Sequence, residues 1–155
     1  MGIETLSRDG GTPVVLVIDD SQDVHRLLKA RLKREELEIA SAMSGEEGIA
    51  LAKKGAPSIV LLDLDMPGMD GFETLRRFKE DSDLRGVPVI VLSGLQSPHD
   101  KVTAFDLGAV DYVTKPFELT ELRVRVRSAL RIQQLMTMLA QRAQVDGLTG
   151  LWNRA

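Results

Sequence analysis

Short runs of apolar, mostly β-branched residues recur along the chain, and nearly every run is stopped by a polar residue. Such runs predict strands of a parallel sheet that is covered on both faces, because neither face then needs polar side chains. The run at 37–40 is the weakest of them. The expected strands occupy residues 14–18, 37–40, 58–62, 87–92 and 110–114.

Segments with helical periodicity separate the expected strands. Ser21 stands where the first helix needs an N-cap, and Ser44 with Glu47 forms a capping-box-like start for the second. The alternation of strands and helices predicts an α/β fold with a doubly wound, parallel five-stranded sheet. The expected helices occupy residues of about 22–34, 44–54, 71–81, 98–107 and 118–145.

The last expected helix is longer than one domain needs. From about residue 118 to 145 it would extend roughly 42 Å at about 1.5 Å per residue. One interpretation is an amphipathic helix that lies on its own domain. We favour a stalk over residues 132–145 that projects and pairs with a second copy. Its apolar stripe alternates spacings of 3 and 4, as heptads do: Ala129, Ile132, Met136, Leu139 and Ala143.

Composition narrows the class of protein. The 155 residues are 43% hydrophobic and 28% charged with a net charge of −3, which indicates a globular domain without general attraction to nucleic acid or membrane. The absence of cysteine excludes disulfides, thiolate zinc sites and cysteine nucleophiles. No apolar run approaches the roughly 18 residues of a membrane span, and the N-terminus is unlike a secretory signal. We expect a cytoplasmic protein in which residues 1–12 form a disordered tail.

Polar residues stand where four of the expected strands end. Sites in open α/β sheets form beyond the carboxyl ends of the strands, so these side chains are expected to converge. Three carboxylates in one crevice repel one another, and a hard divalent cation resolves that conflict, which points to Mg²⁺ or Mn²⁺. The residues are Asp19, Asp20, Asp63, Ser93 and Lys115.

Phosphoryl transfer would use such a set of groups. A metal ion and a lysine neutralise phosphoryl oxygens, a hydroxyl holds one of them, and a carboxylate is the nucleophile. Taken alone, a single Asp at a strand end is more often a helix cap, and a lone Ser or Lys in a loop means little. Five such groups at strand ends are much harder to attribute to chance.

At this point the sequence resembles the receiver domain of two-component response regulators over about residues 13–131. The likeness rests on Val17-Ile18-Asp19-Asp20, on the segment from Leu61 to Gly71, on Ser93-Gly94 and on the segment from Asp111 to Phe117. The resemblance implies a flavodoxin-like fold with strand order 2-1-3-4-5. It also implies phosphorylation of Asp63 by a phosphohistidine on a sensor histidine kinase or a phosphotransfer protein.

The resemblance carries roles onto further positions. Asp20 and Asp63 would bind Mg²⁺ through their side chains, Asp19 through a water molecule and Asp65 through its backbone carbonyl. Ser93 and Lys115 would engage the phosphoryl oxygens and, with Asp63, form the catalytic set. Tyr112 would be the aromatic switch that turns inward when Ser93 moves toward the phosphate. The Asp65 carboxylate is expected to affect the lifetime of the phosphoryl group.

The two histidines have no part in this set. His25 early in the first helix and His99 before the fourth are expected to be solvated surface residues.

The last residues resemble a second family. Asp146-Gly147-Leu148-Thr149-Gly150-Leu151-Trp152-Asn153-Arg154 matches every fixed position of the opening signature of GGDEF diguanylate cyclase domains. The alternative is an Asp-Gly turn followed by a polar tail. The resemblance implies a receiver at 13–131, the stalk, and the start of a truncated cyclase domain at 146–155. The catalytic loop is absent, so the chain itself is not expected to be an enzyme, whereas its parent would condense two GTP into cyclic diguanylate.

Three functions compete at this stage. The first is a phosphoacceptor that controls dimerisation and a cyclase, the second a transcription factor receiver, and the third a small Mg-dependent phosphatase. The homodimer would form through the stalk, through the face of the fourth helix, fifth strand and fifth helix, or through both, with no nucleic-acid or membrane partner. That face would carry charges able to bridge two copies or simply to be solvated: Lys101, Asp106, Asp111, Glu121, Arg123, Arg125 and Arg127.

Overall fold

Strands and helices alternate through the computed structural model, which describes residues 11–66, 70–94 and 98–153. The strands are β1 (Val14–Ile18), β2 (Glu38–Ala42), β3 (Ile59–Asp63), β4 (Val89–Ser93) and β5 (Asp111–Thr114). The helices are α1 (Gln22–Leu32), followed by a 3₁₀ turn (Lys33–Glu35), then α2 (Gly45–Lys54), α3 (Gly71–Glu80), α4 (Pro98–Asp106) and α5 (Leu119–Asn153). The predicted elements are all present, with ends displaced by a few residues except at the carboxyl end of α5, which extends further.

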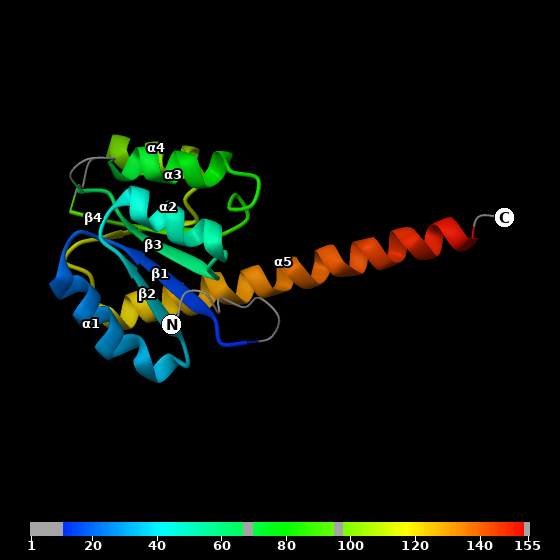
Figure 1. Cartoon of the computed structure of the whole chain (residues 1–155), viewed down its shortest axis with the longest axis horizontal. Helices are drawn as coiled ribbons and strands as arrows, with labels where there is room; N and C mark the ends of the chain where they lie inside the picture. Colours follow the sequence, from blue (N-terminus) through cyan, green and yellow to red (C-terminus); the bar gives the residue numbers. More distant parts are fainter. Residues whose placement is uncertain (1–10, 67–69, 95–97, 154–155) are drawn as a thin grey trace.

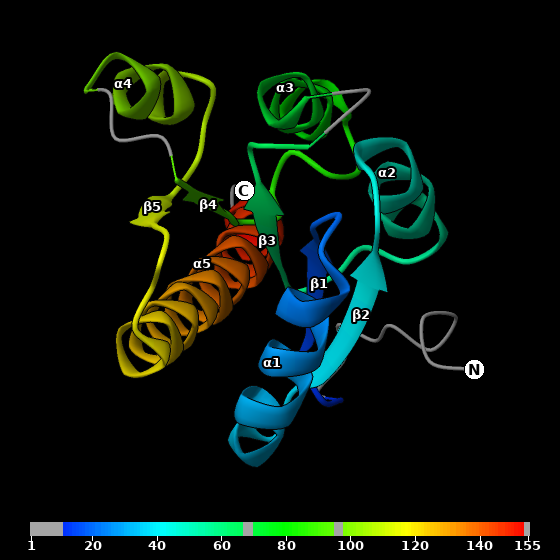
Figure 2. The same ribbon diagram turned by 90° about the vertical axis from the view of Figure 1, so that its left-hand side faces the viewer.

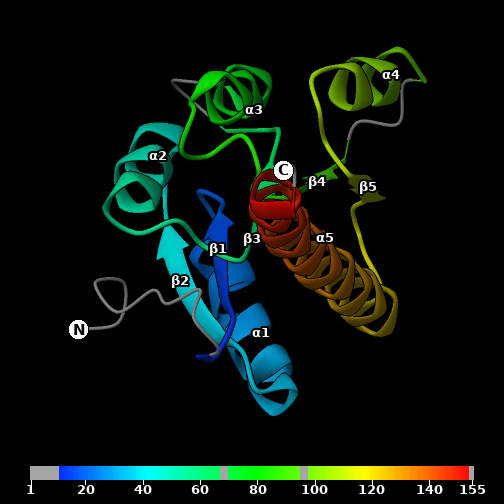
Figure 3. The same ribbon diagram turned by 90° about the vertical axis from the view of Figure 1, so that its right-hand side faces the viewer.

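The strands form one parallel sheet in the order β2-β1-β3-β4-β5. Helices α1 and α5 cover one face, and α2, α3 and α4 cover the other (Figures 2 and 3). This is the predicted flavodoxin-like arrangement. It places the carboxyl ends of β1 and β3 side by side, since these strands are direct neighbours.

The two faces of the sheet bury separate core layers. Leu16 and Ile18 face the layer under α2 and α3, whereas Val15 and Val17 face the layer under α1 and α5. Every residue of β1, β3 and β4 is buried, which explains why their sequences are continuous apolar runs rather than alternating patterns.

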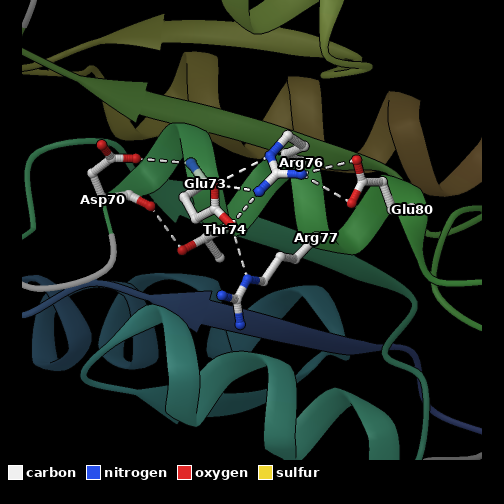
Figure 4. Close-up of polar contacts among 6 residues, drawn as sticks. All are labelled: Asp70, Glu73, Thr74, Arg76, Arg77 and Glu80. Carbon is white, nitrogen blue, oxygen red and sulfur yellow. Dashed lines mark hydrogen bonds and ion pairs between the residues drawn. The ribbon is translucent and has the colours of Figure 1, made fainter.

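Helix caps fix how the chain leaves β1, β2 and β3. The Ser21 hydroxyl accepts a hydrogen bond from Val24 N at 3.4 Å, and the Ser44 hydroxyl accepts one from Glu47 N at 3.1 Å. At α3, the Asp70 carboxylate accepts from Glu73 N at 2.8 Å, and the hydroxyl of buried Thr74 donates to the Asp70 carbonyl (Figure 4). These bonds satisfy donors that a helix N-terminus leaves open and anchor the loops that carry the polar residues.

Helix α5 extends far beyond the sheet (Figure 1). Its 35 residues span about 52 Å at about 1.5 Å per residue. Leu122 and Val126 are buried against the sheet, but Ile132, Met136 and Leu139 are more than half exposed. The far half therefore projects instead of lying on its own domain.

The helix also continues to Asn153, past the expected end near residue 145. Gly147 does not interrupt it, because glycine in a helix costs only about 1 kcal/mol relative to alanine and keeps its backbone hydrogen bonds. Residues 1–10 of the expected tail and residues 154–155 lie outside the described residues, and the division into receiver, stalk and cyclase segments stays a prediction. Among the described helices, none is long and apolar enough to cross a membrane.

Candidate functional site

Three carboxylates converge at the carboxyl edge of the sheet. Asp19 and Asp20 follow β1, and Asp63 ends β3, so the pairing of these two strands brings them together. One carboxylate oxygen from each lies within 4.8 Å of the others. Asp19 and Asp63 are buried, whereas Asp20 is exposed and leaves the cluster open to solvent.

Lys115 supplies a positive charge to this cluster. Its Nζ lies 3.1 Å from Asp19 Oδ2 and 3.3 Å from Asp63 Oδ1. The residue follows β5, and its backbone N–H donates to the Ser93 carbonyl at 2.8 Å, so the side chain reaches across the end of β4. Burial alone would lower the pKa of Lys115, but the carboxylates of Asp19 and Asp63 raise it above its usual value.

The surroundings of Asp63 disfavour the ionised form of its carboxyl group. Burial raises the pKa of Asp63, and the neighbouring charge of Asp19 raises it further, against hydrogen bonds from the Asp65 N–H and from Lys115. Three carboxylates face a single ammonium group within the described cluster, which leaves an excess of negative charge. An oxygen-only donor set with this excess fits a hard divalent cation such as Mg²⁺.

The loop after β3 folds back onto the site. The Asp65 N–H donates to Asp63 Oδ1 at 3.0 Å, while the Asp65 carboxylate accepts from Gly94 N at 3.2 Å. Asp65 thus links the loop after β3 to the end of β4, a contact that the sequence did not predict. The rest of that loop, residues 67–69, lies outside the described residues, as do residues 95–97.

The two residues expected to form the switch, Ser93 and Tyr112, are both buried. Ser93 ends β4 and is fully buried. Tyr112 in β5 is only 8% exposed, and Lys101 Nζ of α4 lies 5.6 Å from its ring centroid. The tyrosine is thus inward in this structure, and its role as a switch stays a prediction.

The expectation of a solvated His25 is wrong. The residue is only 5% exposed, and its Nε2 lies 2.7 Å from the Asp19 carbonyl oxygen. His25 shares a helix face with Leu28 and Leu32, both fully buried, and this spacing of 3 and 4 was the signal that would have found it. His99 is exposed, as expected.

Two arginines of α5 that were expected on the dimer face form ion pairs within the chain instead. Arg127 pairs with Glu35 of the 3₁₀ turn after α1, so it points away from the proposed dimer face. Arg125 Nη1 lies 2.7 Å from Asp111 Oδ2, and its Nε lies 3.0 Å from Glu121 Oε1. These side chains thus find their partners within one chain, because β5 and the 3₁₀ turn flank α5 on opposite sides.

The sheet order and the acidic cluster at the carboxyl edge define a flavodoxin-like α/β protein with its site at the usual position of that class. Residues 15–127 match the response regulator receiver domain family. The chain belongs to this family and is a receiver domain of two-component response regulators.

Individual relatives agree with this assignment. The chain is 37% identical over 150 residues to the response regulator PleD of Caulobacter vibrioides, with 88% of this chain and 33% of PleD covered. It is 45% identical over 118 residues to the transcriptional regulatory protein YkoG of Bacillus subtilis, with 76% and 50% covered. The receiver domain of the Francisella response regulator 1452 superposes with a TM-score of 0.72 at 30% identity, with 77% and 97% covered. The chain spans half or less of both curated relatives.

Proposed function

We propose that Asp63 accepts a phosphoryl group from a phosphohistidine on a sensor histidine kinase or a phosphotransfer protein. The observation that carries this proposal is the buried Asp63 carboxylate with Asp19, Asp20 and Lys115 around it. Mg²⁺, with Mn²⁺ as a substitute, fits the carboxylates of these three aspartates and the backbone carbonyl of Asp65. When bound, the ion offsets the negative charge of the incoming phosphoryl oxygens.

The chain's own residues supply the rest of the chemistry. A carboxylate oxygen of Asp63 attacks phosphorus, the P–N bond to the donor imidazole breaks, and its electron pair leaves with the imidazole. Lys115 already lies 3.3 Å from Asp63 Oδ1 and needs little movement to pair with a phosphoryl oxygen. Ser93, buried at the end of the adjacent strand, donates its hydroxyl to another.

Dimerisation is the proposed output of the phosphorylated domain. The stripe on the projecting half of α5 is exposed in a single chain at Ile132, Met136 and Leu139. The face of α4, β5 and α5 also exposes apolar side chains beside its internal ion pairs: Val102, Phe105, Val110 and Val124. Pairing of two copies would cover both surfaces and carry the signal along the stalk.

A diguanylate cyclase is the proposed output domain. The segment Asp146–Arg154 supports this proposal through its likeness to the opening of GGDEF domains. The match to PleD, which covers 88% of this chain, extends beyond the 76% that YkoG covers. A transcriptional output is the second candidate, since the chain is 45% identical to the transcriptional regulatory protein YkoG over 118 residues. Whether the full-length gene encodes a cyclase domain or a DNA-binding domain decides between them.

Intact mass spectrometry tests the phosphoacceptor directly. The wild-type chain, incubated with a small acyl phosphate and Mg²⁺, is expected to gain one phosphoryl group. Asp63→Asn is expected to gain none, whereas Asp106→Asn, an exposed aspartate of α4, is a matched control that should behave as the wild type. Absence of a Mg²⁺-dependent adduct on the wild type would overturn the proposal.

A further inference from the structure

A buried imidazole lies directly behind the acidic cluster. His25 Nε2 is 2.7 Å from the backbone oxygen of Asp19, and a carbonyl oxygen only accepts hydrogen bonds, so Nε2 carries the proton. The other ring nitrogen, Nδ1, is buried and has no hydrogen-bond partner among the described residues. The ring therefore makes one strong polar contact, and that contact is to the backbone of the site.

The Asp19 peptide is held from several directions. Asp19 N donates to the Ala42 carbonyl at 3.1 Å, and the Asp19 carboxylate accepts from Ser21 N at 2.9 Å. The remaining polar group of that residue is its carbonyl, which His25 holds. The same peptide plane contains the amide nitrogen of Asp20, so the imidazole fixes the direction in which the chain turns from Asp19 into Asp20.

We propose that His25 is a positioning residue for the divalent cation. Its Nε2–H holds the Asp19–Asp20 peptide so that the exposed Asp20 carboxylate points at Asp63 rather than into solvent. This inference rests on the proposed function, because it assumes that the cluster binds Mg²⁺. Asp20 is the cluster member with the least burial, so its position depends most on the backbone that carries it.

A purely space-filling role for His25 predicts something different. Packing alone would leave metal affinity unchanged by any substitution that still folds. An apolar side chain of similar size would also remove the unpartnered Nδ1, whose burial is costly. Positioning instead requires a donor at the place of Nε2, whatever the shape of the rest of the side chain.

Two substitutions separate these roles. His25→Gln retains an N–H donor at the end of a side chain of suitable length, and His25→Leu removes the donor but keeps the volume. We expect His25→Leu to raise the dissociation constant for Mg²⁺ by about tenfold or more, as loss of an outer-shell partner does. Calorimetry at one fixed pH measures this constant. His25→Gln should stay within about threefold of the wild type.

A core control and a spectroscopic readout complete the test. Leu28→Val, on the same face of α1, should lower stability without changing Mg²⁺ affinity. In the metal-free protein, the amide NMR signals of Asp20 and Ser21 should shift in His25→Leu and largely return in His25→Gln. Equal Mg²⁺ affinity in wild type and His25→Leu would overturn the positioning role alone. Absence of Mg²⁺ binding by the wild type would overturn the proposed function together with it.

Discussion

The ammonium nitrogen of Lys115 lies 3.3 Å from Oδ1 of Asp63. The two residues are brought together across the end of β4, because Lys115 follows β5 and Asp63 ends β3. The same nitrogen lies 3.1 Å from Asp19 Oδ2, so one lysine pairs with two buried carboxylates. The resting domain thus contains its own counterion at the place where phosphoryl oxygens would arrive.

Removal of this counterion should destabilise the domain. In Lys115→Met, Asp19 and Asp63 would be left buried with no ammonium group, and we expect a loss of about 3 kcal/mol in the free energy of unfolding at neutral pH. Addition of Mg²⁺ should recover part of the loss. Urea unfolding with and without Mg²⁺ measures both effects.

Lys53 offers the matched control for that experiment. It pairs with Asp81 and Asp83 at the surface, at 2.8 and 3.4 Å, where ion pairs contribute little. Lys53→Met should therefore have little effect on the free energy of unfolding. Equal losses in the two variants would mean that the Lys115 contacts have no special role in stability.

Asp63→Asn should stabilise the domain at neutral pH. Burial and the charge of Asp19 raise the pKa of Asp63 in the folded state above its unfolded value. A raised pKa contributes stability that is present below the unfolded pKa and is lost as the pH rises through the folded one. At pH 7 the ionised carboxylate therefore opposes folding, and its replacement by a neutral amide should raise the free energy of unfolding.

The same variant makes a pH series informative. The advantage of Asp63→Asn over the wild type should shrink as the pH falls toward the ordinary pKa of aspartate, because the wild-type carboxyl is then protonated too. Unfolding midpoints in urea at pH 4, 5, 6 and 7 follow this trend. A difference that does not vary with pH would contradict the raised pKa.

Mg²⁺ should stabilise the folded chain through the acidic cluster. An ion that binds the native state and not the unfolded state adds about 2.7 kcal/mol to the free energy of unfolding when its free concentration is one hundred times the dissociation constant. Asp20→Asn should remove most of this gain, since it deletes one of the three converging carboxylates. Asp23→Asn is the control, because Asp23 is exposed on α1 and its contact to Arg26 is at 4.0 Å. Thermal unfolding of both variants with increasing Mg²⁺ gives the comparison. A similar rise in unfolding temperature for both variants would contradict a role of Asp20 in binding the ion.

Pairing of the stalk depends on the exposed apolar stripe of α5. Leu139, 63% exposed in the single chain, should be covered in the dimer, so Leu139→Glu is expected to weaken association of the beryllofluoride-treated chain by about tenfold or more. Thr137→Glu places the same charge off the stripe and should have little effect. Light scattering after size exclusion reports the dimer fraction. A wild-type chain that stays monomeric at high concentration would rule out this pairing.

The main features of the site could be read from the sequence because topology places them. The apolar runs ending at Asp19 and Asp63 are adjacent strands, so their carboxylates must meet at one edge of the sheet. Lys115 follows from the same argument, since its strand belongs to the same parallel sheet. No side-chain detail was needed for any of these three.

Features that depend on side-chain direction could not be read in this way. The burial of His25 depends on which face of α1 meets the sheet. Because histidine is polar, it was not counted with Leu28 and Leu32, although the three residues are spaced by 3 and 4 along one face of the helix. The pair of Arg127 with Glu35 joins residues 92 positions apart, and no periodicity encodes that contact. The bond from Gly94 N to Asp65 links two loops whose relative position only the folded sheet sets.

Gly71 should be intolerant of any side chain, because α3 begins against the backbone that carries Asp63. A Cβ at this position would lie 2.3 Å from Leu64 Cα and 2.8 Å from the Asp63 carbonyl oxygen, and neither atom can rotate away. We expect Gly71→Ala to lower the free energy of unfolding by about 3 kcal/mol and to slow phosphorylation of Asp63, as the loop must shift. Gly86→Ala, with no atom within 4 Å of its Cβ, should be neutral or slightly stabilising. Urea unfolding and adduct formation measured on both variants give the comparison, and a Gly71→Ala protein as stable and reactive as Gly86→Ala would show that the close approach is not real.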